Sequence, residues 1–244
     1  MPMNLTIANV STSIDDATFA NVVAALSQQV SQDFQPEWGA AAQLTPARLD
    51  LGGGGASINS ATDAIIYLGD STDDPTAGIS GVYGYHSTNY SHIPYGFVFL
   101  NICAAYGEDW SVTLSHEVLE LLADPTAVLT VTGEYPPDSG TAVYYDLEVC
   151  DPTQGDTYLI NSIKVSNFVS RSYFGMPGGS QATNFRNLAL QPFGLRPGGY
   201  LQYEDGTGAH QINGSKVTEE HKAARKLLAG HRRNSRRSAK FQTT

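Results

Sequence analysis

The residues best suited to chemistry lie in the run VTLSHEVLELLADP, residues 112–125. His116, Glu120 and Asp124 recur every four residues, and apolar residues fill most positions between them, which is typical of a half-buried helix. Successive helical residues are about 100° apart, so His116 and Glu120 point within roughly 40° of each other, about 6 Å apart along the axis. An imidazole and a carboxylate in this arrangement can bind one metal ion.

Glu117 directly follows His116, so its side chain would lie beside such an ion instead of binding it. From that position a carboxylate can act as a general base toward water. The segment reads HExxE, whereas zinc proteases carry HExxH with two zinc-binding histidines. Glu120 is a harder ligand than histidine, which shifts the preference from zinc toward manganese, calcium or magnesium. The alternative is an ordinary amphipathic helix with a partly buried histidine and two solvated glutamates.

A second acidic cluster, DLEVCDP at residues 146–152, follows this helix after about 20 to 30 residues, a distance at which a neighbouring segment can supply a third ligand. Glu148 and Asp151 are the candidates, and the sequence leaves open which of them binds. Cys150 lies inside the cluster and can pack under a metal site. The alternative is a polar strand that ends in an Asp-Pro turn.

Four blocks in order resemble one known family: SVTLSHEVLELLADP, LEVCDP, IKVSNFVSRSYF and PFGLRPGGYLQY, within residues 60–205. The family is encoded by tailed bacteriophages and their bacterial hosts, and it is similar in layout to zincin-type metallopeptidases. The resemblance implies that His116, Glu120 and an acid of LEVCDP bind a divalent metal, zinc in the first place and manganese or calcium otherwise. It also implies that Glu117 is catalytic.

The segment before the metal helix, residues 81–101, is rich in tyrosine and phenylalanine. In zincin-like layouts the strand before the metal helix forms the sheet edge with which an extended peptide pairs. Tyr85 and His86 are therefore expected to face the substrate. The alternative is that both are packing or surface residues.

The remaining pattern predicts an α+β fold. Apolar periodicity predicts strands at residues 5–10, 38–51 and 64–68, a helix between residues 13 and 36, and a hairpin around Asn161 and Ser162. We expect a zincin-like mixed sheet with an N-terminal helix and a metal-site helix, followed by a C-terminal part rich in strands and loops. A length of 244 residues fits one domain over residues 1–215, with halves at about 1–125 and 126–215.

Charge separates this domain from a basic tail at residues 216–244. The tail holds nine of the 14 Lys and Arg and two of the 24 acids, so its net charge is 9 − 2 = +7, against 5 − 22 = −17 for the rest. Such a body is not expected to bind nucleic acid. Residues 219–228 of the tail are expected to form a short basic helix. The tail is expected to extend into solvent or dock on the chain itself, with contact to an acidic protein surface or to nucleic acid as the alternatives.

Two classes of function remain. The first is a metal-dependent hydrolase that cleaves a peptide or protein substrate; the second is a phage virion or accessory structural protein whose metal site is vestigial or stabilising. A cytoplasmic binding module without metal is a third interpretation. We expect neither a signal peptide nor a membrane span, and so no export by the usual route. Together with the resemblance to the phage family, this implies the bacterial host cytoplasm or the virion. The two cysteines are too few for a disulfide scaffold.

Overall fold

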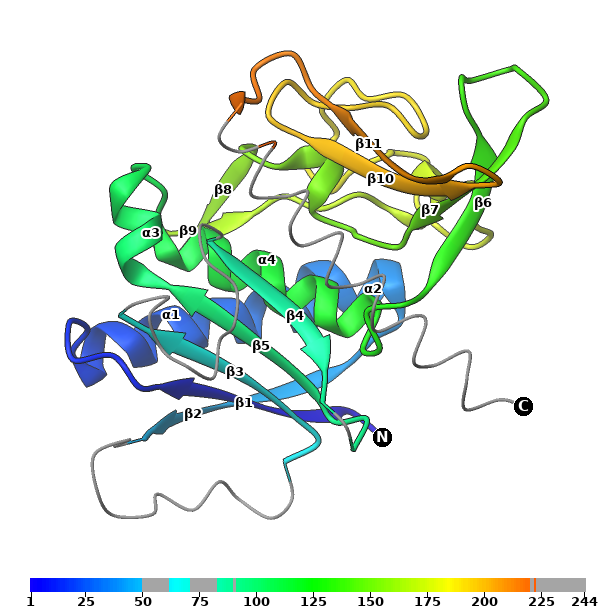
Figure 1. Ribbon diagram of the computed structural model, residues 1–244. Coiled ribbons are helices and arrows are strands. Elements are labelled where there is room, and N and C mark those ends of the chain that lie inside the picture. The colour runs from blue at the N-terminus through cyan, green and yellow to red at the C-terminus, as the bar shows by residue number, and fades with distance from the viewer. Residues whose placement is uncertain (50–61, 71–82, 90, 220–221, 223–244) are drawn as a thin grey trace.

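The computed structural model describes residues 1–49, 62–70, 83–89, 91–219 and 222 (Figure 1). The fold is α+β, as the sequence predicts. The basic tail, with a helix expected at residues 219–228, lies almost entirely outside the described residues. Within the described part, no helix has the length and apolar character needed to cross a membrane.

The N-terminal half forms a five-stranded mixed sheet in the order β2-β1-β3-β5-β4. All neighbours are parallel except β4 and β5, which are antiparallel. The predicted strands at residues 5–10 and 64–68 are confirmed, and Pro46 lies in β2, at a sheet edge where a missing N–H is tolerated. The strands are β1 (Met3–Asn9), β2 (Ala42–Arg48), β3 (Ala64–Gly69), β4 (Gly84–Thr88) and β5 (Pro94–Phe99).

The segment before the HExxE helix differs from the expectation of one edge strand. It forms two antiparallel strands, and β5, the later one, lies inside the sheet between β3 and β4. The edge strand on this side of the described sheet is β4. The apolar run that ends β5 continues directly into a short helix, α3 (Leu100–Ala105).

The N-terminal helix begins where predicted, because Asp15 caps it by accepting a hydrogen bond from the Thr18 N–H at 2.8 Å. It runs as α1 (Asp16–Gln28), continues as a π-helical segment (Gln29–Phe34), and ends in α2 (Gln35–Trp38). The predicted helix is therefore confirmed, with one wider turn in its path.

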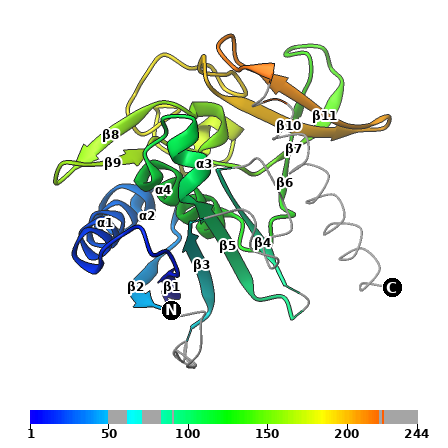
Figure 2. The ribbon, with the colours of Figure 1, turned by 60° about the vertical axis from the view of Figure 1, so that its left-hand side comes forward.

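The helix that carries the HExxE segment is α4 (Trp110–Ala123), and the prediction that it is half-buried is wrong. Every residue from Ser111 to Leu122 is buried. The reason is that α4 lies between two layers: β3, β4 and β5 pack against it on one side, and β9 (Ile163–Ser166) packs on another (Figure 1; Figure 2). Its polar residues must therefore find partners inside the protein.

The C-terminal half is built from strands and loops, as expected. Its four-stranded sheet has the order β11-β10-β7-β6. The predicted hairpin is confirmed as β8 (Thr157–Ile160) and β9, joined by Asn161 and Ser162, both with positive φ. The remaining elements are β6 (Thr130–Glu134), β7 (Ala142–Asp146), β10 (Tyr200–Asp205), β11 (Gly208–Asn213) and the 3-10 turns Asp151–Thr153 and Arg171–Phe174.

A buried polar network fixes α4 to its neighbours. Ser115 Oγ donates to Gln29 Oε1 at 2.7 Å and accepts from the Ser166 N–H at 3.0 Å. Gln29 in turn donates to the Ser166 carbonyl at 2.9 Å. The network joins the π-helical segment, α4 and β9, and so sets the position of the helix that holds His116.

Candidate metal centre

The helical spacing and the downstream acids meet in the structure. His116 Nε2 lies 3.1 Å from Glu120 Oε2, one turn along α4, and 3.2 Å from Asp151 Oδ1. Glu120 Oε1 also accepts a hydrogen bond from the Cys150 N–H at 3.1 Å. Three of the predicted ligands therefore converge in a buried position at the start of the 3-10 turn Asp151–Thr153.

Donor atoms at ligand spacing form two groups among the described residues. One group is His116, Glu120 and Cys150, and the other is His86, Glu120 and Glu148; within each group the donor atoms all lie within 4.8 Å of one another. All five residues are buried. Imidazole, carboxylate and thiolate are ligand types that zinc and other transition metals bind in proteins, so the donor set fits a divalent cation.

Glu117 lies beside this cluster, as predicted. Its Oε2 is 3.5 Å from His86 Nδ1, and it has no hydrogen-bond partner within the part of the chain that the structure describes. Gly84 of β4 packs directly against it: a Cβ at Gly84 would lie 3.1 Å from Glu117 Cγ. The carboxylate is thus held by packing, with an oxygen left available to accept a proton.

Two pKa shifts follow from this environment. Burial alone would lower the pKa of His116, but the Glu120 and Asp151 carboxylates raise it well above its usual value. Burial raises the pKa of the Cys150 thiol, and the neighbouring Glu120 carboxylate raises it further. A metal cation would reverse both effects, because it binds the deprotonated forms.

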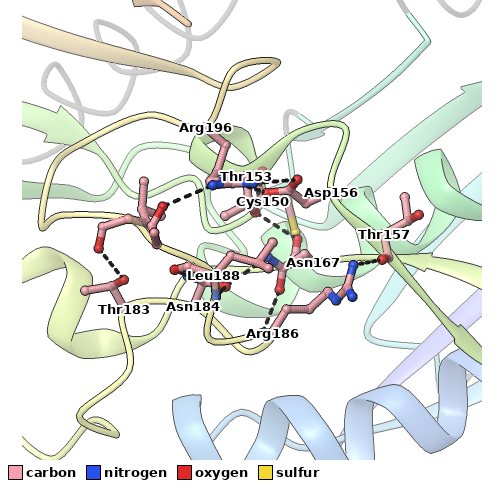
Figure 3. A network of polar contacts seen from close by, with 12 residues as sticks. Cys150, Thr153, Asp156, Thr157, Asn167, Thr183, Asn184, Arg186, Leu188 and Arg196 are labelled. Atoms are coloured by element: carbon pink, nitrogen blue, oxygen red, sulfur yellow. Dashed lines mark hydrogen bonds and ion pairs between the residues drawn. The ribbon is translucent and has the colours of Figure 1, made fainter.

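The turn that carries Cys150 and Asp151 is held by its own polar contacts (Figure 3). Thr153 Oγ1 donates to the Cys150 and Asn167 carbonyls at 3.2 and 3.1 Å, and the Arg196 N–H donates to the Pro152 carbonyl at 2.9 Å. Gly199 approaches the same carbonyl so closely that a Cβ there would lie 2.1 Å from it. The loop at residues 194–199 therefore supports the ligand turn.

The sequence left open which acid, Glu148 or Asp151, is the third ligand, and the structure brings both to the cluster. Asp151 faces His116, whereas Glu148 joins His86. Asp124, on the same helical stripe as Glu120, lies elsewhere: its carboxylate accepts from the N–H groups of Thr126 and Leu129. It closes the loop after α4.

The two residues expected to face substrate point to opposite sides of β4, because side chains alternate along a strand. His86 faces α4 and the acids. Tyr85 is buried on the other face of the sheet, where its ring lies 5.6 Å from that of Phe97, so the structure does not bring Tyr85 into the site.

The sequence predicts that His86 faces substrate and that Cys150 packs under the site, and it places neither in the predicted ligand set. The available signal for His86 was strand alternation with Gly84, which places both on one face. The signal for Cys150 was its place within the acidic cluster. Comparison of the chain with protein-family models, curated proteins and solved structures found no match.

Proposed function

We propose that this chain is a metal-dependent hydrolase, with a peptide bond as the substrate that the zincin resemblance implies. The observation that supports it most is the convergence of His116, Glu120 and Asp151, with contacts of 3.1 and 3.2 Å. A bound divalent cation, zinc in the first place, would supply Lewis acidity toward the scissile carbonyl and the attacking water.

The protein's own groups have distinct roles in this proposal. His116, Glu120 and Asp151 hold the cation. Glu117 accepts the proton of the attacking water and passes it to the leaving nitrogen. The side chains of His116 and Glu117 are 11% and 6% exposed, against 1% for Glu120, so substrate would approach on their side.

The carboxylate-rich ligand set affects the expected rate. Each added negative charge on the cation raises the pKa of a water beside it and reduces its power as a Lewis acid. Two carboxylates and one histidine are therefore expected to support slower hydrolysis than two histidines would. We expect narrow substrate choice and low turnover.

A second candidate function is a structural protein whose cation only stabilises the fold. The depth of the cluster favours it, because Glu120, Glu148, Cys150 and Asp151 are almost fully buried. Glu117 discriminates between the two functions, since a stabilising site has no use for a general base beside its ligands.

The test compares Glu117→Gln with His116→Ala, using the exposed Glu134→Gln as the matched control. Metal content is measured by elemental analysis, and cleavage is measured on a peptide library. The hydrolase predicts that Glu117→Gln keeps the metal and loses at least about 100-fold in rate, while His116→Ala loses both. Wild-type protein that holds metal but cleaves nothing, with Glu117→Gln indistinguishable from it, would establish the structural function.

A further inference from the structure

The two groups of donor atoms overlap at one residue. Glu120 belongs both to the group with His116 and Cys150 and to the group with His86 and Glu148. Its Oε2 lies 3.1 Å from His116 Nε2 and 4.0 Å from His86 Nδ1. One carboxylate oxygen thus lies within 4.0 Å of two imidazoles that come from different elements, α4 and β4.

We propose that the cluster binds two divalent cations bridged by Glu120. The first cation is held by His116 and Asp151, to which Cys150 adds a sulfur ligand, and the second by His86 and Glu148. The inference deepens the proposed function and rests on it only in taking the cluster as a metal centre. Carboxylate-bridged ions in two-metal hydrolases lie about 3.5–4 Å apart, which suits donors grouped around a single shared side chain.

His86 provides an independent observation. It is 1% exposed, and neither ring nitrogen has a hydrogen-bond partner among the described residues. A buried polar group without such a partner costs free energy. A single cation at His116, Glu120 and Asp151 leaves this histidine outside its ligand set, whereas a second cation at His86 and Glu148 gives the ring a ligand role.

Charge also favours two cations over one. Glu117, Glu120, Glu148, Cys150 and Asp151 are all buried, and as four carboxylates and one thiolate they carry 5 × (−1) = −5. One divalent cation leaves −3 in the protein interior, whereas two cations leave −1. Uncompensated buried charge is strongly unfavourable. The second cation therefore neutralises buried negative charge that remains when only the first is bound.

The two positions differ in their donors, and the difference supplies a spectroscopic marker. The first includes the Cys150 sulfur, a soft ligand that zinc and cobalt accept well; the second offers only nitrogen and oxygen, which also suit manganese. Cobalt bound to a thiolate shows a charge-transfer absorption that cobalt bound only to nitrogen and oxygen lacks. Each position can therefore be followed separately.

The first experiment measures stoichiometry. The full chain is stripped with a chelator, titrated with Zn²⁺ by calorimetry, and analysed for zinc after removal of the excess. We expect two ions per chain, and one in His86→Ala and in Glu148→Gln, with the exposed His92→Ala as matched control. One ion per chain in wild type would overturn the proposal, and so would two ions in both cluster variants.

The second experiment uses Co²⁺ absorption and Mn²⁺ electron paramagnetic resonance. The thiolate band is expected in wild type, in His86→Ala and in the control Cys103→Ser, and is expected to be absent in Cys150→Ser. Cys103 is a matched control because it is also buried, but contacts Thr113. Wild type loaded with two Mn²⁺ should show a spin-coupled pair, and only isolated Mn²⁺ signals would contradict the bridge.

The experiments can overturn the hydrolase function and the two-cation centre independently of each other. Glu117-dependent hydrolysis by a protein that binds one ion would leave the hydrolase standing and overturn the two-cation centre. Two bound ions without any hydrolysis would support the two-cation centre and overturn the hydrolase. The wild-type stoichiometry needs no variant, so a variant that does not fold, as judged by circular dichroism, leaves the main result intact.

Discussion

Gly84 positions Glu117 through the absence of a side chain. A Cβ at this position would lie 2.7 Å from the Phe97 carbonyl oxygen, and 3.1 Å from both Cγ and Oε1 of Glu117. The Phe97 carbonyl belongs to the paired strand β5 and cannot move without disturbing the sheet. The general base that we propose therefore depends on a glycine in the neighbouring edge strand.

Gly84→Ala is predicted to destabilise the protein and to displace Glu117. We expect a loss of about 1–3 kcal/mol in the free energy of unfolding, as for other overpacked positions, measured by urea denaturation, together with reduced peptide cleavage and retained metal. Gly206→Ala is the control, because a Cβ there meets nothing within 4 Å. Equal stability and cleavage in the two variants would show that the contact is unimportant.

At the scale of elements, α4 is buried on every side, and its orientation depends on polar contacts as well as apolar packing. Ser115 lies one residue before His116, and its hydroxyl joins Gln29 to the Ser166 N–H. Both partners are buried. If the Ser115 hydroxyl were removed, neither partner could form a hydrogen bond with bulk water in its place.

Ser115→Ala is predicted to lower the free energy of unfolding by about 2–4 kcal/mol, because it removes the partner of two buried groups at about 1–3 kcal/mol each. Ser31→Ala serves as control. Ser31 lies in the same π-helical segment as Gln29, but it is exposed, and its hydroxyl donates to carbonyls of its own helix. Chemical denaturation checks both. A change below about 0.5 kcal/mol for Ser115→Ala would refute the structural role of the network.

At the scale of the whole molecule, the candidate metal-binding cluster joins the two halves of the chain. His86, Glu117 and Glu120 come from β4 and α4, whereas Glu148, Cys150 and Asp151 come from the segment between β7 and β8. The main apolar core likewise includes residues of both halves. A cation bound here would therefore cross-link segments that are far apart in sequence.

Removal of the metal is predicted to lower thermal stability. A ligand that binds only the folded state at a thousand times its Kd contributes about 4 kcal/mol, which is roughly 8–16 °C in Tm for a chain of this size. Differential scanning calorimetry with and without chelator measures the shift. His116→Ala should shift less on chelation than wild type, and an unchanged wild-type Tm would argue against a bound cation.

The sequence by itself determined the local parts of this site. The helical period alone places His116 and Glu120 on one stripe with Glu117 beside them, and alternating apolar residues predict β1, β3 and the β8–β9 hairpin. These features depend on neighbours within a few residues, which is why pattern and spacing suffice to predict them.

Only the tertiary structure decided which residues distant in sequence lie next to His116 and Glu120. His86 faces Glu117 and Tyr85 does not, because β4 pairs antiparallel with β5 in a register that turns alternate side chains toward α4. The turn after β7 brings the Cys150 N–H to Glu120, thirty positions away, and places Glu148 and Asp151 beside different histidines. Strand order and loop packing set these contacts, and neither is encoded in the local spacing of the residues themselves.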